Sequence, residues 1–525
     1  MRPRLQLIAV VIAVSSSIAL ALPADATGRH RTPPPARRGV ADFNGDGHAD
    51  LAISAAQETV AELKSAGAVH VLNGSSSGLT STGSKRLTEN TPSVPGSAAS
   101  GDLFGGALAT GDFDDDGFSD LAVGVPGRDT SFFDVGAVVV FYGSATGLSG
   151  TGSQRFAEAD VGEPADSQDQ FGTALTAGDF DRDGVDDLAI GVPGREVAGQ
   201  PLAGAVGVLY GNPGTGLASG SSQLITEDDL PGGHPHQEAR FGSALVAANF
   251  GMSDKDDLVV GAPLDTDGST IAGSASIVYG SATGLDTSTG AIFHSSALPG
   301  SHPGDDSFFG STFAWGRVGG NDLADLVVGA PGEKAGRRDR AGAVYLLLGR
   351  DGGVTGVGAR RITESSAGVP SIAERDEFFG TALAVGNFGG TTHDDLAISA
   401  PGEVVGGIEE AGAVFVLPGS ASGPNAAKTQ KFTLDTPGIP GVVEDEGFFG
   451  EDALAAGNFG RGGRADLAVA SRSETVSGKS LAGAVRALYG TVGGLTGNRA
   501  QRWTAASKGV AGDPGTSFHF GYSLV

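Results

Sequence analysis

The sequence predicts an all-β fold, a seven-bladed β-propeller of four-stranded antiparallel blades, and two observations support it. The first is an internal repeat of about 70 residues, and the second is that the two chain ends are complementary parts of one strand. Repeats of this length with short strands between glycine turns are typical of propeller blades. Seven Phe-Gly pairs mark the repeat, beginning at Phe104, Phe171, Phe241, Phe309, Phe379, Phe449 and Phe520.

The repeat that runs from Phe171 to Glu227 shows the expected strands. Apolar alternation and β-branched residues predict four of them, at Phe171–Phe180, Asp187–Pro193, Ala203–Gly211 and Ser222–Glu227. Four antiparallel strands per repeat match one blade. A β-helix coil would be far shorter, and a helical repeat would show a period of 3.6 residues.

The ends of the chain predict how the ring closes. Residues Phe520–Val525 match the first six residues of the strand that starts at Phe171, and Val40–Phe43 match its last four. In a closed ring the C-terminus then completes the first blade and removes the open edges of a linear array. We therefore predict one propeller domain over residues 39–525.

Each repeat contains a nine-residue loop that ends in Asp and is followed by Leu. The loops span Asp42–Asp50, Asp112–Asp120, Asp179–Asp187, Asn249–Asp257, Arg317–Asp325, Asn387–Asp395 and Asn458–Asp466. In the first three, oxygen-bearing side chains stand at positions 1, 3, 5 and 9, and a glycine at position 6 permits a sharp turn. This pattern predicts Ca²⁺ sites, with a backbone carbonyl at position 7 as a further ligand.

The predicted metal ligands are Asp42, Asn44, Asp46, His48 and Asp50; Asp112, Asp114, Asp116, Phe118 and Asp120; and Asp179, Asp181, Asp183, Val185 and Asp187. Of these, His48, Phe118 and Val185 would contribute the backbone carbonyls. An EF-hand does not fit, because a strand follows position 9 where an EF-hand carries a glutamate at position 12 on a helix. An aspartate-rich hairpin turn without metal is the alternative that stays open.

The other four loops have lost most of these side chains. Asn or Arg stands at position 1, and Gly stands at position 3. We expect metal-free turns, in which the asparagine amide bonds the position-9 aspartate and Arg317 pairs with Asp325.

The order of Phe-Gly, nine-residue loop, Asp-Leu and Gly-Ala-Pro-Gly resembles the FG-GAP repeats of the integrin alpha-chain N-terminal β-propeller. The cleanest copy of the last element is Gly329–Gly332, and Gly124–Gly127 and Gly191–Gly194 are close copies. The resemblance implies a calcium-binding propeller that acts as a non-catalytic binding or adhesion module. FG-GAP propellers also resemble the non-catalytic part of a glycosylphosphatidylinositol-cleaving phospholipase. The alternative is therefore a secreted hydrolase, or a carbohydrate-binding propeller that uses loops opposite the cation loops.

The N-terminal segment predicts export. Arg2 and Arg4, the apolar run Leu7–Leu22 and Ala24–Ala26 form a signal peptide over residues 1–26. A membrane anchor is the alternative, but the apolar run is short for a bilayer. Residues 27–38 form a basic, proline-rich linker. We expect a secreted or extracellular protein, with cell-wall association as a further option.

The composition of the chain limits the classes of partner that it is expected to bind. The formal net charge of −27 argues against nucleic acid, and the lack of cysteine excludes disulfides and a cysteine nucleophile. We expect a monomer without a membrane span after cleavage, and an extracellular protein or glycan as its ligand. Segments that could contact this ligand are Arg128–Asp134, Glu333–Arg340 and the loops around Phe308 and Phe378.

Other motifs have simpler explanations. Gly419–Gly423 and Gly74–Gly78 fit the Gly-x-Ser-x-Gly nucleophile pattern, but the same place in other repeats is the turn before the fourth strand. His234 and His236 are either solvated loop histidines or a metal pair, and Asp265–Gly268 is interpreted as a polar turn. We predict no catalytic residue, and about three Ca²⁺ ions as the only cofactor.

Overall fold

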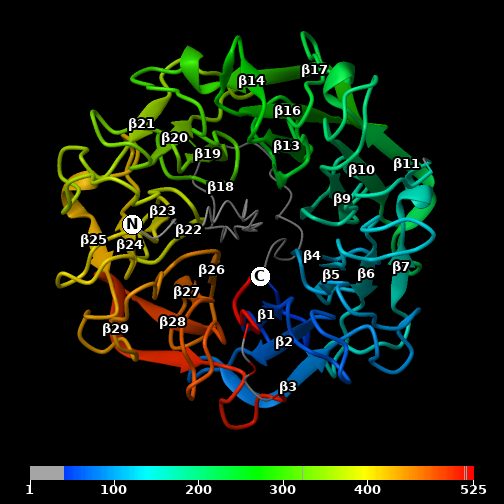
Figure 1. Ribbon diagram of the computed structural model, residues 1–525, viewed down its shortest axis with the longest axis horizontal. Helices are drawn as coiled ribbons and strands as arrows, with labels where there is room; N and C mark the ends of the chain where they lie inside the picture. Colours follow the sequence, from blue (N-terminus) through cyan, green and yellow to red (C-terminus); the bar gives the residue numbers. More distant parts are fainter. Residues whose placement is uncertain (1–40, 163, 322, 513–514, 516) are drawn as a thin grey trace, which may run out of the picture.

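The described residues form seven blades around a central axis, as Figure 1 shows. In the computed structural model these residues are 41–162, 164–321, 323–512, 515 and 517–525. The predicted signal peptide, residues 1–26, and the linker, residues 27–38, lie outside them. The all-β, seven-bladed architecture expected from the repeat is confirmed.

The strands follow the chain from the centre of each blade to its rim (Figure 1). Blade 1 contains β1 (Leu51–Ala55), β2 (Ala68–Asn73) and β3 (Thr80–Leu87); blade 2 contains β4 (Leu108–Gly111), β5 (Asp120–Gly124), β6 (Val138–Phe141) and β7 (Gln154–Phe156); and blade 3 contains β8 (Leu175–Gly178), β9 (Asp187–Val192), β10 (Ala205–Tyr210) and β11 (Ala218–Ile225).

The remaining blades have the same order. Blade 4 contains β12 (Ala244–Ala248), β13 (Asp257–Ala262), β16 (Ser274–Ser281) and β17 (Gly284–His294); blade 5 contains β18 (Phe313–Gly316), β19 (Asp325–Ala330), β20 (Ala343–Leu347) and β21 (Arg360–Ile362). Blade 6 contains β22 (Leu383–Gly386), β23 (Asp395–Ala400), β24 (Ala413–Leu417) and β25 (Gln430–Phe432); blade 7 contains β26 (Leu454–Gly457), β27 (Asp466–Ser471), β28 (Ala484–Thr491) and β29 (Gly494–Trp503).

Small elements decorate the loops. A two-stranded hairpin, β14 (Thr266–Asp267) and β15 (Thr270–Ile271), extends the loop between β13 and β16. The described chain also contains the short 3-10 helices η1 (Glu158–Val161), η2 (Glu227–Asp229), η3 (Ser295–Ala297) and η4 (Ala426–Lys428). No helix among the described residues is long and apolar enough to cross a membrane.

The strands predicted for the repeat that begins at Phe171 lie in the right places, and their boundaries differ by one to several residues. The first strand is shorter than expected, because only β8 pairs with its neighbour and the residues from Phe171 onward lead into it. The fourth strand, β11, begins at Ala218 rather than Ser222. A register shift between Val208 and Tyr210 lets β10 pair with this extra segment.

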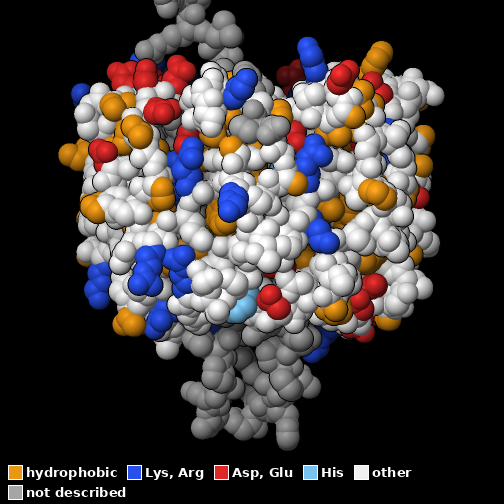
Figure 2. Space-filling view, turned by 90° about the horizontal axis from the view of Figure 1, so that it is seen from below, with side chains coloured by type: hydrophobic (Ala, Val, Ile, Leu, Met, Phe, Trp, Pro, Cys, Tyr) orange, Lys and Arg blue, Asp and Glu red, His pale blue; other side chains and the backbone are white. Residues whose placement is uncertain are grey.

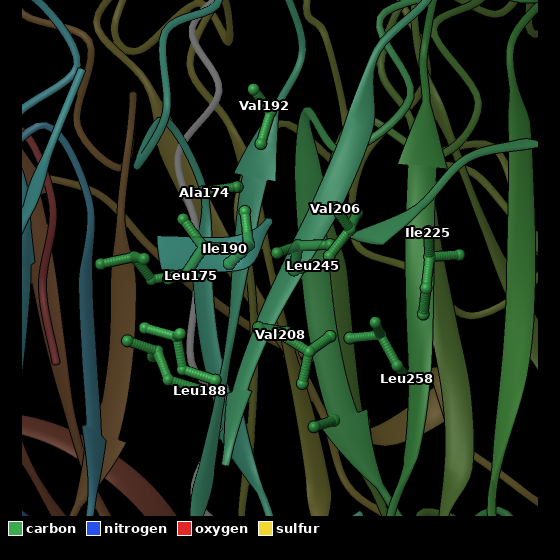
Figure 3. Packing of buried hydrophobic residues seen from close by; sticks show 14 of the residues in the cluster. Ala174, Leu175, Leu188, Ile190, Val192, Val206, Val208, Ile225, Leu245 and Leu258 are labelled. Carbon is green, nitrogen blue, oxygen red and sulfur yellow. The ribbon is translucent and has the colours of Figure 1, made fainter. Parts of the chain in front are cut away.

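The core lies between blades. All six residues of β9 and of β10 are buried, because neighbouring blades cover both faces of a blade, so these strands are continuously apolar rather than alternating. Figure 3 shows Val206 and Val208 beside Leu245 and Leu258 of the next blade. The rim is different: in the edge-on view of Figure 2, charged side chains are scattered and hydrophobic ones form small, separated groups.

Two glycines of the repeat bring successive blades into contact. A Cβ atom on Gly124 of β5 would lie 2.0 Å from the carbonyl oxygen of Gly172 in the next blade, and one on Gly191 would lie 2.0 Å from that of Gly242. A distance of 2.0 Å is far inside van der Waals contact. The first glycine of each Gly-Val-Pro-Gly segment therefore permits the glycine of the following Phe-Gly pair to approach closely.

The C-terminus closes the ring as expected, and it lies beside β1 in Figure 1. The backbone N–H of Ala52 donates to the oxygen of Val525 at 2.8 Å, and the N–H of Val525 donates back to Ala52 at 3.1 Å. The N–H of Ser54 donates to the oxygen of Ser523 at 2.9 Å. The last residues thus provide the innermost strand of blade 1, which has three strands of its own.

Substitution of Leu524 by alanine tests this closure. Leu524 is fully buried, so Leu524→Ala should reduce the free energy of unfolding by about 2–5 kcal/mol. Chemical denaturation monitored by circular dichroism measures the change. Val492→Ala is the control, because Val492 is 82% exposed and its loss should change stability by less than about 0.5 kcal/mol. Equal effects of the two variants would contradict closure through the C-terminal strand.

Candidate metal sites

The seven nine-residue loops lie at one face of the propeller. Each connects the first and second strands of a blade, and strands alternate in direction, so these loops all emerge at the same face. We call it the cation-loop face. The connections from second to third strand, and from fourth strand to the next blade, lie at the opposite face.

The aspartate at position 9 is buried and accepts two backbone hydrogen bonds. Asp120 accepts one from the N–H of Phe113 and one from the N–H of Gly143, both at 2.8 Å. Asp325, in a loop without the calcium pattern, accepts hydrogen bonds from the N–H of Gly319 at 3.0 Å and the N–H of Gly349 at 3.1 Å. The same carboxylate therefore fastens the loop to the turn after the third strand whether or not the other ligands are present.

The carboxylates at positions 1, 3 and 9 of the second loop converge. Asp112, Asp114 and Asp120 each place an oxygen within 4.8 Å of the others, as do Asp179, Asp181 and Asp187 in the third loop. The N–H of Asp116 and of Gly117 donate to Asp112 at 3.1 Å, which wraps the loop around this point. Asp114 Oδ1 is buried without a hydrogen-bond partner among the described residues, as expected for an oxygen that faces a cation site.

The first loop has a similar shape with an amide in the set. Asn44 Oδ1 accepts from the N–H of Asp46 at 2.9 Å, while Asn44 Nδ2 lies 3.3 Å from both oxygens of Asp50. Asp42 accepts from the N–H of Asp46 at 3.0 Å. An asparagine ligand would present its oxygen to the ion, so this loop offers a weaker charge than the next two.

Burial makes these carboxylates hard to ionise in the absence of an ion. It raises the pKa of Asp120 and Asp187 to about 8 and that of Asp50 to about 7. The pKa of Asp114 is also raised, first by burial and then by repulsion from Asp116 and Asp112. A divalent cation would offset both the burial and the repulsion.

Two of the other four loops depart from one detail of the sequence prediction. The amide of Asn249 donates to the carbonyl of Ser253 at 3.1 Å, and that of Asn387 donates to the carbonyl of Thr391 at 2.6 Å. The expectation that these amides bond the position-9 aspartate was therefore wrong for both loops. Backbone N–H groups already occupy that aspartate, so the amide closes its own loop instead.

Position 8 holds neighbouring loops together, a role that sequence reasoning missed. Asp186 accepts from the N–H of Asp112 at 2.9 Å, and its own N–H donates to the oxygen of Asp112 at 3.0 Å. Asp256 makes the same pair of bonds to Asp179, each at 3.1 Å. In the fifth loop, Arg317 bonds through its N–H to Asp394 of the next blade at 2.9 Å. The Asp-Asp-Leu sequence of three repeats was the signal for this role.

The opposite face contains two further acidic clusters. Glu227, His236 and Asp265 place ligand atoms within 4.8 Å of one another, and so do three buried glutamates between blades 5 and 6. His236 Nδ1 lies 2.7 Å from Asp265 Oδ1, so Asp265, assigned from the sequence to a polar turn, also pairs with a histidine.

The Gly-x-Ser-x-Gly segments are turns, as expected. Ser75 Oγ donates to the carbonyl of Gly78 at 2.6 Å, and Ser420 makes the equivalent bond to Gly423. Each hydroxyl closes its own turn before the fourth strand of a blade or, in blade 6, before η4 and β25.

Comparison with a family model identifies FG-GAP repeats in three parts of the chain. The matches cover residues 39–72, 104–141 and 171–209. Each matched segment contains one of the three loops with a full set of oxygen ligands, and the resemblance seen in the sequence is confirmed.

Curated relatives agree with this result. The chain is 31% identical over 177 residues to phosphatidylinositol-glycan-specific phospholipase D of Homo sapiens, a match that covers 33% of this chain and 20% of that protein. It is 37% identical over 158 residues to integrin alpha-PS5 of Drosophila melanogaster, covering 30% and 14%, respectively. It is 31% identical over 237 residues to integrin alpha-5 of Xenopus laevis, covering 44% and 20%.

The chain thus carries FG-GAP repeats in an integrin alpha-like β-propeller. It spans a fifth or less of the length of each of these three relatives.

Replacement of Asp325 by alanine tests the structural role of position 9. Two buried N–H groups, those of Gly319 and Gly349, would lose their acceptor, so Asp325→Ala should cost about 2–4 kcal/mol of stability with or without Ca²⁺. Asp351→Ala in the nearby turn removes an exposed carboxylate and should change stability by less than about 0.5 kcal/mol. Urea denaturation in calcium and in chelator measures both; a cost for Asp325→Ala that depends on Ca²⁺ would contradict this role.

Proposed function

We propose that the chain is a secreted, calcium-stabilised propeller that acts as a non-catalytic binding or adhesion module. One observation carries the proposal. The three loops with a full ligand set are the three that lie within the matched FG-GAP repeats. Relatives that are named integrin alpha chains support a role in binding.

Calcium would act as a clamp on three consecutive loops. The side chains at positions 1, 3 and 5 would bind it together with the carbonyls of His48, Phe118 and Val185 and the position-9 carboxylates. The unpartnered, buried Oδ1 atom of Asp114 supports such a site. An ion that binds only the folded chain stabilises it by mass action.

Secretion fits this chemistry. The charged start, apolar run and small residues of positions 1–26 form a signal peptide, with cleavage after Ala26. Outside cells, millimolar calcium would fill sites of modest affinity.

The opposite face supplies a surface for a ligand. Phe132 and Phe133, in the connection between β5 and β6, are 47% and 73% exposed. Exposed aromatic side chains on a loop are typical anchors for a partner. Phe378 is a further aromatic residue on this face, and the guanidinium group of Arg340 lies 5.7 Å from the centre of its ring.

Calcium binding is tested by substitution within one loop. Asp114→Asn replaces a predicted carboxylate ligand by an amide, as at Asn44 of the first loop, and should weaken Ca²⁺ binding about tenfold or more, because a negative charge facing the ion is lost. The rise in melting temperature that Ca²⁺ produces should shrink, while the melt in chelator stays nearly unchanged. Isothermal titration and melting curves measure these effects.

Asp115→Asn is the matched control, since it makes the same charge change at an exposed position that is not a predicted ligand. If both variants lower Ca²⁺ affinity equally, general charge rather than coordination explains the binding. If the wild-type protein binds no Ca²⁺, the loops are turns without metal.

Ligand binding is tested on a glycan array and a panel of immobilised extracellular proteins. We expect binding to at least one of them, and Phe133→Ser should weaken it about tenfold or more because a solvent-exposed anchor is lost. Val492→Ala, on the cation-loop face, should leave it unchanged.

A second candidate is hydrolysis of phosphatidylinositol glycan, favoured by the match to the phospholipase D of that specificity. Release of a glycosylphosphatidylinositol-anchored protein from membranes by the purified chain would support this candidate and contradict a non-catalytic role.

A further inference from the structure

A cluster of three buried glutamates lies between blades 5 and 6, on the face opposite the cation loops. Glu364 follows β21, Glu377 stands two residues before Phe379, and Glu403 follows β23. One oxygen of each carboxylate lies within 4.8 Å of the others. The three residues are 0%, 2% and 6% exposed, respectively. Three acidic groups therefore converge with little access to water.

Two of the three glutamates have partners, and one does not. Lys431 Nζ lies 2.6 Å from Glu403 Oε1, and the N–H of Glu374 donates to Glu377. Both oxygens of Glu364 are buried without a hydrogen-bond partner among the described residues. A buried carboxylate without a donor is costly, so Glu364 needs a proton or a cation.

Two other blade junctions have different residues at the three positions that are glutamates between blades 5 and 6. The equivalent residues are Glu89, Asp102 and Arg128 between blades 1 and 2, and Glu158, Asp169 and Arg195 between blades 2 and 3. The equivalence is visible in the repeat: the first residue follows the fourth strand, the second precedes the Phe of Phe-Gly by two positions, and the third follows Pro-Gly.

At those junctions an arginine forms ion pairs with the acidic residues. Arg128 Nη1 lies 3.1 Å from Asp102 Oδ2 and 3.5 Å from Glu89 Oε1. Arg195 pairs with Glu158. Between blades 5 and 6, Glu403 stands where the arginine stands elsewhere. The positive group is replaced by a third carboxylate, and among the described residues the Lys431 ammonium forms its ion pair with Glu403.

We infer that a Ca²⁺ ion binds at the junction of blades 5 and 6, with Glu364, Glu377 and Glu403 as its carboxylate ligands. Ca²⁺–oxygen distances of about 2.3–2.6 Å separate two ligands of one ion by at most about 5 Å, a condition that the cluster meets. An all-carboxylate set favours a hard cation such as Ca²⁺ over a transition metal. At this junction the ion supplies the positive charge that a guanidinium group supplies at the two arginine junctions.

Protons compete with Ca²⁺ for these carboxylates. Burial, with repulsion from Glu403 and Glu377, raises the pKa of Glu364 to about 10, and burial raises that of Glu377 to about 7. The ion-free cluster therefore retains protons at neutral pH, and Ca²⁺ binding releases them.

The test uses the full chain with Ca²⁺ and with Tb³⁺ as an anomalous-scattering substitute. Wild-type crystals soaked in Tb³⁺ should show a peak at the junction, in addition to any in the cation loops. Glu403→Arg rebuilds the arginine arrangement, so it should lose this peak and bind one Ca²⁺ ion fewer by titration. Glu89→Gln removes the equivalent of Glu364 from an arginine junction and should leave the number of bound ions unchanged.

A wild-type protein without a peak at the junction, or with as many bound ions as Glu403→Arg, would overturn the inference. Glu364→Gln, which is nearly isosteric, gives the same comparison if Glu403→Arg does not fold. The loop variant Asp114→Asn should keep the junction peak, so the loop sites and the junction site can fail independently of each other.

Discussion

The interaction on which the propeller depends is the pair of backbone hydrogen bonds accepted by the position-9 aspartate. This carboxylate joins the loop after the first strand to the turn after the third, and so fixes three of the four strands of a blade relative to one another. It does so in blade 2, where the loop has the predicted calcium ligands, and in blade 5, where the loop lacks them. The fold and the proposed metal site therefore share one residue, but only the fold requires it in every repeat.

The loops also form a connected chain around the cation-loop face. Asp186 bonds the backbone of Asp112, and Asp256 bonds that of Asp179, so the first residue of each of these loops is held by the next blade. The three ligand-rich loops belong to consecutive blades. An ion in one of them would restrict a residue that its neighbour also holds, and the proposed calcium sites would thus stiffen one arc of the ring rather than three separate points.

Sequence reasoning was most successful where the information is local. The repeat length, the position of each loop and the closing strand all follow from residues that are close in the chain or at its ends. It was wrong about the amides of Asn249 and Asn387, because the competing donors come from the backbone of the folded loop. It did not find the glutamate cluster between blades 5 and 6, because Glu364, Glu377 and Glu403 belong to three segments that only blade packing brings together.

Burial of acidic groups also affects loops outside the proposed metal sites. The pKa of Asp325 and Asp257 is raised to about 7, and that of Asp466 to about 8, in loops without the calcium pattern. A folded-state pKa above the ordinary 3.8 means that the folded chain binds more protons than the unfolded chain between these values. Stability from these groups therefore falls as the pH rises from about 4 to 8. Under the proposed function, cations would offset this loss only in loops that keep the other predicted ligands, so the acidic loops of blades 1 to 3 would couple the stability of the ring to its ionic surroundings.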